Sequence, residues 1–248
     1  MLRGKHQWGV NMKTADEIGL DLDGWLGGRI PPSDATVRAE AFTYSPAQWR
    51  RWWPATLDQP EAVSTSDARR SIRRADLYQG SVGLTTPTEA IELYTRMSGW
   101  GCETKPYSTW RAVRALHPAG VGERLLEAHL LVRTGRTAEA FTQMQRGGDH
   151  HVQGFGASFF TRWLYFSAYD AWDASWGPAP LILDQRVAAA IGYRRWMWSV
   201  DEYLYYLDFC EKLQALWRPE EPTHVIEYAL FQASHRSPLS LRRPQLQA

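Results

Sequence analysis

Helix-start signals are the feature that most constrains the fold of this chain. Ser45-Pro46-Ala47-Gln48, Thr86-Pro87-Thr88-Glu89 and Ser199-Val200-Asp201-Glu202 each place a hydroxyl side chain three residues before Glu or Gln. In such a capping box, the two side chains satisfy backbone amides at a helix N-terminus. Apolar residues at three- and four-residue spacing follow, and no convincing run of alternating strand residues accompanies them. The sequence therefore predicts an all-α fold.

Length and composition suit one domain. With 248 residues, of which 44% are hydrophobic, the chain can bury a core divided between two lobes. We expect residues 1–36, which are polar and glycine-rich, to form an irregular N-terminal arm or a first small element packed on the core. Residues 235–248 are rich in Arg, Pro and Gln and are expected to form a mobile tail. The prediction is a single two-lobed domain over residues 1–248, acting as a monomer.

Several classes of protein are disfavoured by residue patterns. No apolar run reaches the roughly 18 residues that span a bilayer, and residues 1–13 lack the apolar core of a signal peptide. Cys102 and Cys210 are too few for a disulfide framework. His150 and His151 are adjacent and cannot hold zinc at helical i, i+4 spacing. We expect a cytoplasmic protein with no membrane segment, no metal and no cofactor.

Charge alone does not indicate a nucleic-acid binder, because the net charge is only +1. The basic residues are nevertheless unusual in kind, since only four of the 28 are lysine, at positions 5, 13, 105 and 212. Arginine is the better planar partner for phosphates and base edges. A GC-rich genome, which favours arginine codons, explains the bias equally well.

Two arginine clusters have alternative interpretations. Residues 68–77 carry four arginines and are predicted to form one helix, in which like charges repel unless DNA phosphates or acidic residues of the partner lobe offset them. Residues 49–53 read Trp-Arg-Arg-Trp-Trp. They form either a nucleic-acid surface or a helix end with aromatic side chains inward and arginines in water, and the second is favoured.

The stretch from His151 to Ala190 carries the strongest functional pattern. Gly154-Phe155-Gly156 predicts a tight turn between two helices, the second running over residues 157–169. Glycines in such a turn let backbone amides approach a phosphate, although a simple helix-to-helix turn needs them too. Leu181-Ile182-Leu183-Asp184 then places an acid at the start of a helix over residues 185–191. Asp184 is either an ordinary N-cap or a carboxylate held for chemistry.

These motifs resemble a known family. The glycine turn, Phe160-Thr161-Arg162-Trp163-Leu164-Tyr165-Phe166 and Leu181-Ile182-Leu183-Asp184-Gln185-Arg186-Val187 are similar to the 8-oxoguanine DNA glycosylase fold, in the helix-hairpin-helix glycosylase superfamily, and most similar to its archaeal and bacterial branch. The resemblance implies a two-lobed helical domain whose hairpin grips the DNA backbone. In that family a lysine attacks the sugar and an aspartate assists. Asp184 matches the aspartate, and the lysine's place falls on Arg162.

The resemblance implies a DNA glycosylase that flips out and excises a damaged or modified base from double-stranded DNA. The family's usual base is 8-oxoguanine; another modified base, including one in foreign DNA, stays open. Asp184 would stabilise the sugar cation as the base leaves. Arg162 cannot readily form a Schiff base, because its guanidinium stays protonated, so base release without strand cleavage is expected. Arg162 would instead hold a phosphate or orient Asp184, or simply lie on a solvent face.

The same resemblance assigns the remaining site residues. The DNA-binding residues are expected to be Gln153, Gly154, Gly156 and Arg186, and the base pocket Trp100, Phe155, Phe159 and Trp163. For Trp100, which lies in a Trp-Gly pair expected to end a helix near Met97, a buried tryptophan beside a glycine turn is the alternative. The protein would associate with the nucleoid. The alternative function is a catalytically silent DNA-binding or protein-interaction module on the same fold.

Overall fold

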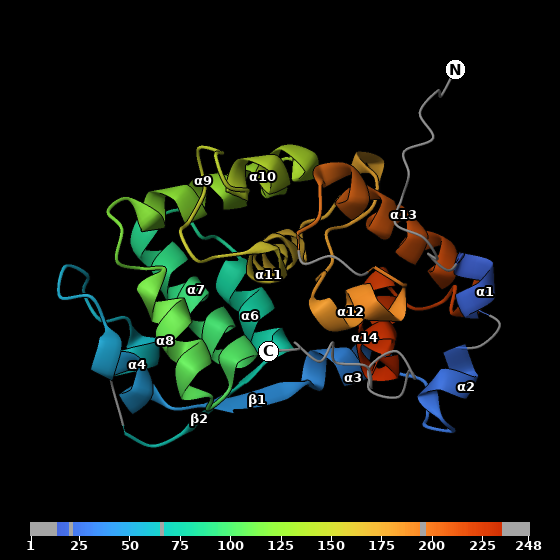
Figure 1. The fold of residues 1–248 in the computed structure, drawn as a ribbon, viewed down its shortest axis with the longest axis horizontal. Helices are drawn as coiled ribbons and strands as arrows, with labels where there is room; N and C mark the ends of the chain where they lie inside the picture. Colours follow the sequence, from blue (N-terminus) through green and yellow to red (C-terminus); the bar gives the residue numbers. More distant parts are fainter. Residues whose placement is uncertain (1–13, 20–21, 65–66, 194–196, 235–248) are drawn as a thin grey trace, which may run out of the picture. The chain divides into compact units, whose positions relative to one another are not determined.

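A computed structural model describes residues 14–19, 22–64, 67–193 and 197–234 (Figure 1). The chain divides into two compact units. Unit 1 joins the described residues up to Asp34 with those from Leu183 onward, and unit 2 comprises residues 35–182. The described residues are mostly helical and contain one sheet, of two strands. The predicted all-α fold is confirmed.

Unit 1 is built from short N-terminal helices and three helices that follow Leu183. Its elements are α1 (Ala15–Gly19), α2 (Leu22–Leu26), α12 (Gln185–Ala190), α13 (Val200–Trp217) and α14 (Thr223–Ala233). Helix α14 contacts α2, α12 and α13, and α1 packs on α13. Helix α3 (Asp34–Ala39) begins at the last residue of unit 1, where Asp34 pairs with His224 at 2.8 Å.

In the described part of residues 1–36, the chain does not form an irregular arm but the alternative, a small element packed on the core. Residues 15–19, 22–26 and 34–36 are helical. Ile18, Leu22 and Leu26 recur every four residues and are all buried. That spacing is helical, and the burial of these three side chains stabilises the helices. The polar, glycine-rich composition of the segment did not indicate them. The tail expected over residues 235–248 lies outside the described residues.

Unit 2 is a helical bundle with a β-ribbon. Strand β1 (Ala41–Tyr44) pairs antiparallel with β2 (Arg70–Arg73), with Ala41 opposite Arg73 and Tyr44 opposite Arg70. The helices are α4 (Pro46–Trp52), α5 (Glu61–Ser64), α6 (Arg74–Ser81), α7 (Pro87–Cys102), α8 (Pro106–Arg114), α9 (Val121–Arg133), α10 (Thr137–Met144) and α11 (Ala157–Ala168), followed by the 3₁₀ turn η1 (Ala174–Trp176). In Figure 1, α9 and α10 lie on one side of α7 and α11, and the ribbon lies on the other.

Two of the three predicted capping boxes form. The amide of Glu89 donates to the Thr86 hydroxyl at 3.3 Å, and the Thr86 amide donates to the Glu89 carboxylate at 2.9 Å. Ser199 and Glu202 make the same exchange. Helix α4 begins at Pro46 as predicted, but Ser45 makes no side-chain cap bond. Gln48 donates instead to the carbonyl of Thr104, so a tertiary contact replaces the third box.

The helix break predicted at residues 98–102 is wrong, because α7 continues to Cys102. A Cβ at Gly99 would lie 3.1 Å from Cγ of Tyr44, and one at Gly101 would collide with the guanidinium of Arg162. Both glycines therefore allow close side-chain packing on a continuous helix.

The single helix predicted over residues 68–77 is also wrong. Arg70–Arg73 form β2, and α6 begins only at Arg74. Pairing with β1 overrides the local helical spacing. Arg74 is 2% exposed, and its Nε donates to Oε2 of Glu40 at 2.6 Å. The carboxylate of Glu40, which lies in the same unit as Arg74 and not in a partner lobe, therefore offsets the charge of Arg74.

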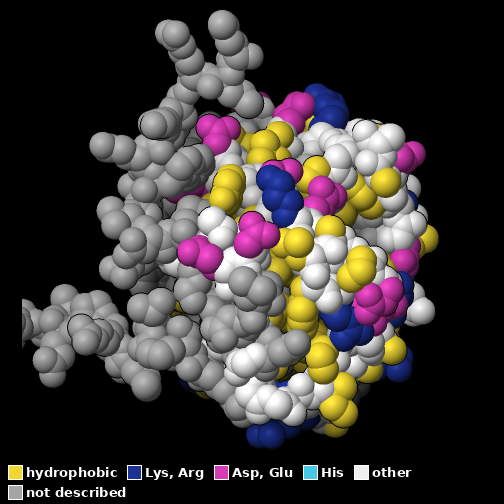
Figure 2. Space-filling view, turned by 90° about the vertical axis from the view of Figure 1, so that its right-hand side faces the viewer, with side chains coloured by type: hydrophobic (Ala, Val, Ile, Leu, Met, Phe, Trp, Pro, Cys, Tyr) yellow, Lys and Arg dark blue, Asp and Glu magenta, His cyan; other side chains and the backbone are white. Residues whose placement is uncertain are grey.

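Exposed apolar side chains give no reason to assign a hydrophobic partner. Helix α13 exposes Leu204, Tyr205 and Leu216. On the face drawn in Figure 2, hydrophobic side chains are dispersed among acidic and basic ones. Scattered exposure of this kind is normal for folded proteins. Among the described helices, none has the length and apolarity to cross a membrane.

Buried His129 on α9 predicts a loss of stability in mild acid. Burial, with repulsion from Arg133, lowers its pKa to about 4. Its pKa in the unfolded chain is about 6.5, so the unfolded state binds more protons below that pH. The free energy of unfolding should therefore fall from pH 6.5 towards pH 4, by about 2 kcal/mol from this group between pH 7 and pH 5. Urea unfolding of the native chain and of His129→Gln at both pH values measures the difference. An equal pH dependence in both would contradict it.

Candidate nucleic-acid interface

The turn between α10 and α11 presents an exposed backbone on a buried anchor. Gly154 has a φ of +84°, a left-handed conformation that favours glycine. Phe155 is 4% exposed, and its ring lies 5.1 Å from that of Tyr94. Gln153, Gly154 and Gly156 are exposed. The predicted tight turn between two helices is confirmed, and Phe155 fixes it to the core.

Gly156 leaves open space at the positive end of α11. It is the N-cap of the helix, and its carbonyl accepts from the amides of Phe159 and Phe160 at 2.8 and 3.0 Å. Its φ of −73° suits any residue, and a Cβ added there would meet nothing within 4 Å. The amides of Gly154 and Gly156 donate to no acceptor in the part of the chain that is described. Exposed amides at a helix N-terminus form an anion-binding arrangement.

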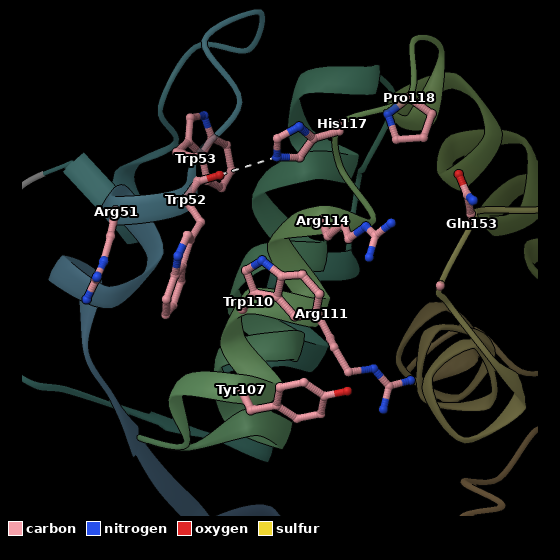
Figure 3. Close-up of a pocket in the computed structure, with 11 residues that line it drawn as sticks. Arg51, Trp52, Trp53, Tyr107, Trp110, Arg111, Arg114, His117, Pro118 and Gln153 are labelled. Atoms are coloured by element: carbon pink, nitrogen blue, oxygen red, sulfur yellow. Dashed lines mark hydrogen bonds between the residues drawn. The ribbon is translucent and has the colours of Figure 1, made fainter.

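A hollow of about 920 Å³ adjoins this turn in unit 2 (Figure 3). We call it the Trp–Arg hollow. The end of α4, helix α8 with the residues after it, and the turn supply its walls. The lining residues are Arg51, Trp52, Trp53, Tyr107, Trp110, Arg111, Arg114, His117, Pro118, Gln153 and Gly154. They include three arginines and no carboxylate, so the hollow has the charge of an anion-binding site.

Aromatic side chains form much of the hollow's surface. The rings of Tyr107 and Trp110 are stacked with centroids 5.7 Å apart. The guanidinium carbon of Arg114 lies 5.3 Å from the Trp110 ring, and that of Arg51 lies 5.5 Å from the Trp52 ring. Nε2 of His117 lies 3.4 Å from the carbonyl oxygen of Trp52 (Figure 3). The hollow thus combines flat apolar faces with cations.

Sequence reasoning missed the α8 wall of this hollow. Tyr107, Trp110, Arg111 and Arg114 recur at three- and four-residue spacing, which places them on one helix face. That spacing was the available signal. At residues 49–53, Trp49 is fully buried as the favoured interpretation expects, but Arg51, Trp52 and Trp53 line the hollow.

Asp184 caps α12 in unit 1. Its Oδ1 accepts from the amides of Arg186 and Val187 at 2.8 and 3.0 Å. The residue is 9% exposed and follows the buried Leu181-Ile182-Leu183. The predicted N-cap is therefore confirmed, and two amides fix the direction of the carboxylate. Arg186 is exposed, with its guanidinium carbon 4.9 Å from the ring of Phe231.

Arg162 lies on α11 in unit 2, and its guanidinium packs between Phe159 of the same helix and the end of α7. Its guanidinium carbon is 5.2 Å from the Phe159 ring, and the group fills the space above Gly101. Its charge opposes, but does not outweigh, the burial that raises the pKa of Cys102 to about 11. Arg162 is half-buried, so the solvent-face alternative does not describe it.

Three of the four predicted base-pocket residues lie in the core of unit 2. Trp163 is fully buried, and its Nε1 donates to the carbonyl of Leu125 at 3.1 Å. Trp100 is 5% exposed and lies edge-on to Phe42 and Phe166, while Phe155 anchors the turn. Their burial leaves no open face for a base in this structure. Phe159 is half-buried.

Residues 35–231 match a family described as "Putative 8-oxoguanine DNA glycosylase OGG-like protein". The matched segment includes the turn, Arg162 and Asp184. Comparisons with curated proteins and with solved structures gave no significant match.

Proposed function

The chain belongs to this family of OGG-like proteins, and from that premise we propose that it is a DNA glycosylase that flips out and excises a damaged or modified base. Asp184 is the observation that carries the proposal. Its carboxylate is nearly buried at a helix N-terminus and is directed by two backbone amides. Cleavage of the C1′–N bond places positive charge on the sugar. A carboxylate oriented before the reaction stabilises that charge without reorganising, and can activate water.

We propose that base release occurs without strand cleavage. Lyase chemistry needs an amine that forms a Schiff base with the sugar, and guanidinium is a poor nucleophile. Of the lysines that the structure describes, Lys105 pairs with Glu103 at 2.7 Å and Lys212 pairs with Asp208 at 2.8 Å. In this proposal Arg162 is a positioning residue that helps to hold α11 against α7 and, through it, the turn.

The experiment is a base-release assay on duplex oligonucleotides that carry 8-oxoguanine or other modified bases one at a time. Mass spectrometry identifies the released base. We expect release from at least one modified duplex and none from the unmodified one. Binding without release from any of them would favour the alternative, a catalytically silent DNA-binding module. The burial of Trp100, Phe155 and Trp163 is the observation that favours that alternative.

The turn should hold the DNA backbone, so Gly156→Asp is expected to weaken binding to every duplex tested. A carboxylate there would repel phosphate and accept the amide hydrogen bonds that phosphate needs. The substitution should not unfold α11, since Asp is a favoured N-cap and the space is open. Affinity by fluorescence anisotropy should fall about tenfold in low salt and by less in high salt.

Gly156→Asn is the matched control, because Asn caps a helix nearly as well but carries no charge. It should bind substantially more tightly than Gly156→Asp. Unchanged affinity in the aspartate variant, with the fold intact, would mean that the turn serves packing only.

A further inference from the structure

We propose that the Trp–Arg hollow binds an unstacked nucleotide of single-stranded DNA beside the turn, through residues of unit 2 alone. The proposal rests on the proposed function only in taking DNA as the nucleic acid. It predicts that the protein binds single strands through side chains that contribute little to binding of a paired duplex.

Shape and aromatic content support a base as the occupant. Trp52 at the end of α4 and Trp110 on α8 both line the hollow, and Tyr107, stacked on Trp110, is 69% exposed. Exposed aromatic faces bind bases by stacking, with little dependence on sequence. A volume of about 920 Å³ falls in the range of roughly 300–1,000 Å³ that encloses ligands of drug or nucleotide size.

Charge supports a phosphate beside that base. Arg111 and Arg114 extend from α8 on the side that faces the turn, near Gln153 (Figure 3). Within the part of the chain that the structure describes, neither of them nor Arg51 forms an ion pair. Other arginines of unit 2 differ, since Arg50 pairs with Asp67 and Arg136 pairs with Glu139. Uncompensated arginines gathered in one hollow favour an anion.

Continuity with the turn supports a strand that runs between the two features. Gln153 and Gly154 belong both to the exposed turn and to the lining of the hollow. A strand whose phosphate lies at the Gly156 amide can therefore place a neighbouring nucleotide in the hollow. Bases of an intact duplex are stacked on one another and cannot offer a face to Trp52 or Trp110. The hollow should therefore select unpaired DNA.

The test measures binding of the full-length protein to fluorescein-labelled dT12 and to a 12-base-pair duplex by anisotropy. Trp110→Ala and Trp52→Ala should each weaken dT12 binding by about tenfold, and duplex binding by less than about twofold. Trp110→Phe keeps an aromatic face and should restore most of the affinity. Trp176→Ala, a half-exposed tryptophan outside the hollow, should bind dT12 as the native chain does. Urea unfolding confirms that each variant is folded.

A second arm tests the charges. Arg111→Gln should lower the slope of log K against log salt for dT12 by about 0.7, the value expected for one phosphate contact on a single strand. Arg69→Gln, an exposed arginine that does not line the hollow, should leave the slope unchanged.

Native-like dT12 binding by folded Trp52→Ala and Trp110→Ala would overturn the proposal, as would an equal loss for dT12 and duplex. If poly-glutamate competed as strongly as unlabelled dT12 does, and with the same strength in both tryptophan variants, that result would assign the hollow to an acidic protein instead. Because dT12 carries no modified base, its measured affinity does not depend on whether the protein has glycosylase activity. Binding of dT12 and base release from a modified duplex are separate measurements, so the two proposals fail separately.

Discussion

Asp184→Asn should lower the rate of base release by about 10²-fold or more, because it removes the charge that stabilises the sugar cation in a dry site. The substitution keeps the shape, and Asn caps a helix nearly as well as Asp. The two hydrogen bonds from the amides of Arg186 and Val187 can therefore persist, with α12 in place. Single-turnover base release, with enzyme in excess over a duplex that the native chain processes, measures the change.

Asp173→Asn is the matched control. Asp173 also caps a helical turn, accepting from the amide of Ser175 at 2.8 Å, but it is exposed. Its substitution should leave base release unchanged. If Asp184→Asn released base at the native rate, Asp184 would be only a helix cap and the catalytic assignment would be wrong.

Glu40→Gln should destabilise the protein by about 3–5 kcal/mol, because it removes the negative charge that balances the buried charge of Arg74. The two side chains are 9% and 2% exposed, and their contact is 2.6 Å. Arg74 also donates to the hydroxyl of Tyr165 at 3.3 Å and lies over the Trp100 ring, so one ion pair links the residue that precedes β1 with α6, α7 and α11. Urea unfolding gives the free energy.

The exposed pair Arg136 and Glu139 provides the comparison. Their contact is also 2.6 Å, but the side chains are 55% and 42% exposed. Solvent screening should limit the effect of Glu139→Gln to less than about 1 kcal/mol. Similar losses for Glu40→Gln and Glu139→Gln would show that burial does not set the strength of the first pair.

Local signals predicted local structure well. The boxes at Thr86 and Ser199 and the cap at Asp184 depend on side chains within three residues of the amides that they bind, so the sequence contains the whole interaction. The turn at Gly154 was also predictable, because a left-handed residue between two apolar helices favours glycine.

Features that depend on distant partners were not predictable in this way. The arginines at 70–73 form a strand because residues 41–44 pair with them, and Gly99 allows a ring from β1 to approach α7. The Trp–Arg hollow joins α4, α8 and the turn, which are far apart in sequence. Helix α8 alone has an ordinary amphipathic pattern, so only the fold shows that its aromatic and basic side chains face the same space as those of α4.

The fate of the DNA strand after base release tests the central claim most directly. The measurement uses the duplex that releases most base, analysed by denaturing gel with and without alkali, and a parallel reaction with borohydride. We predict that the strand breaks only after alkali and that borohydride traps no protein–DNA adduct. Strand cleavage without alkali together with a trapped adduct, or a failure to release any base, would contradict the account.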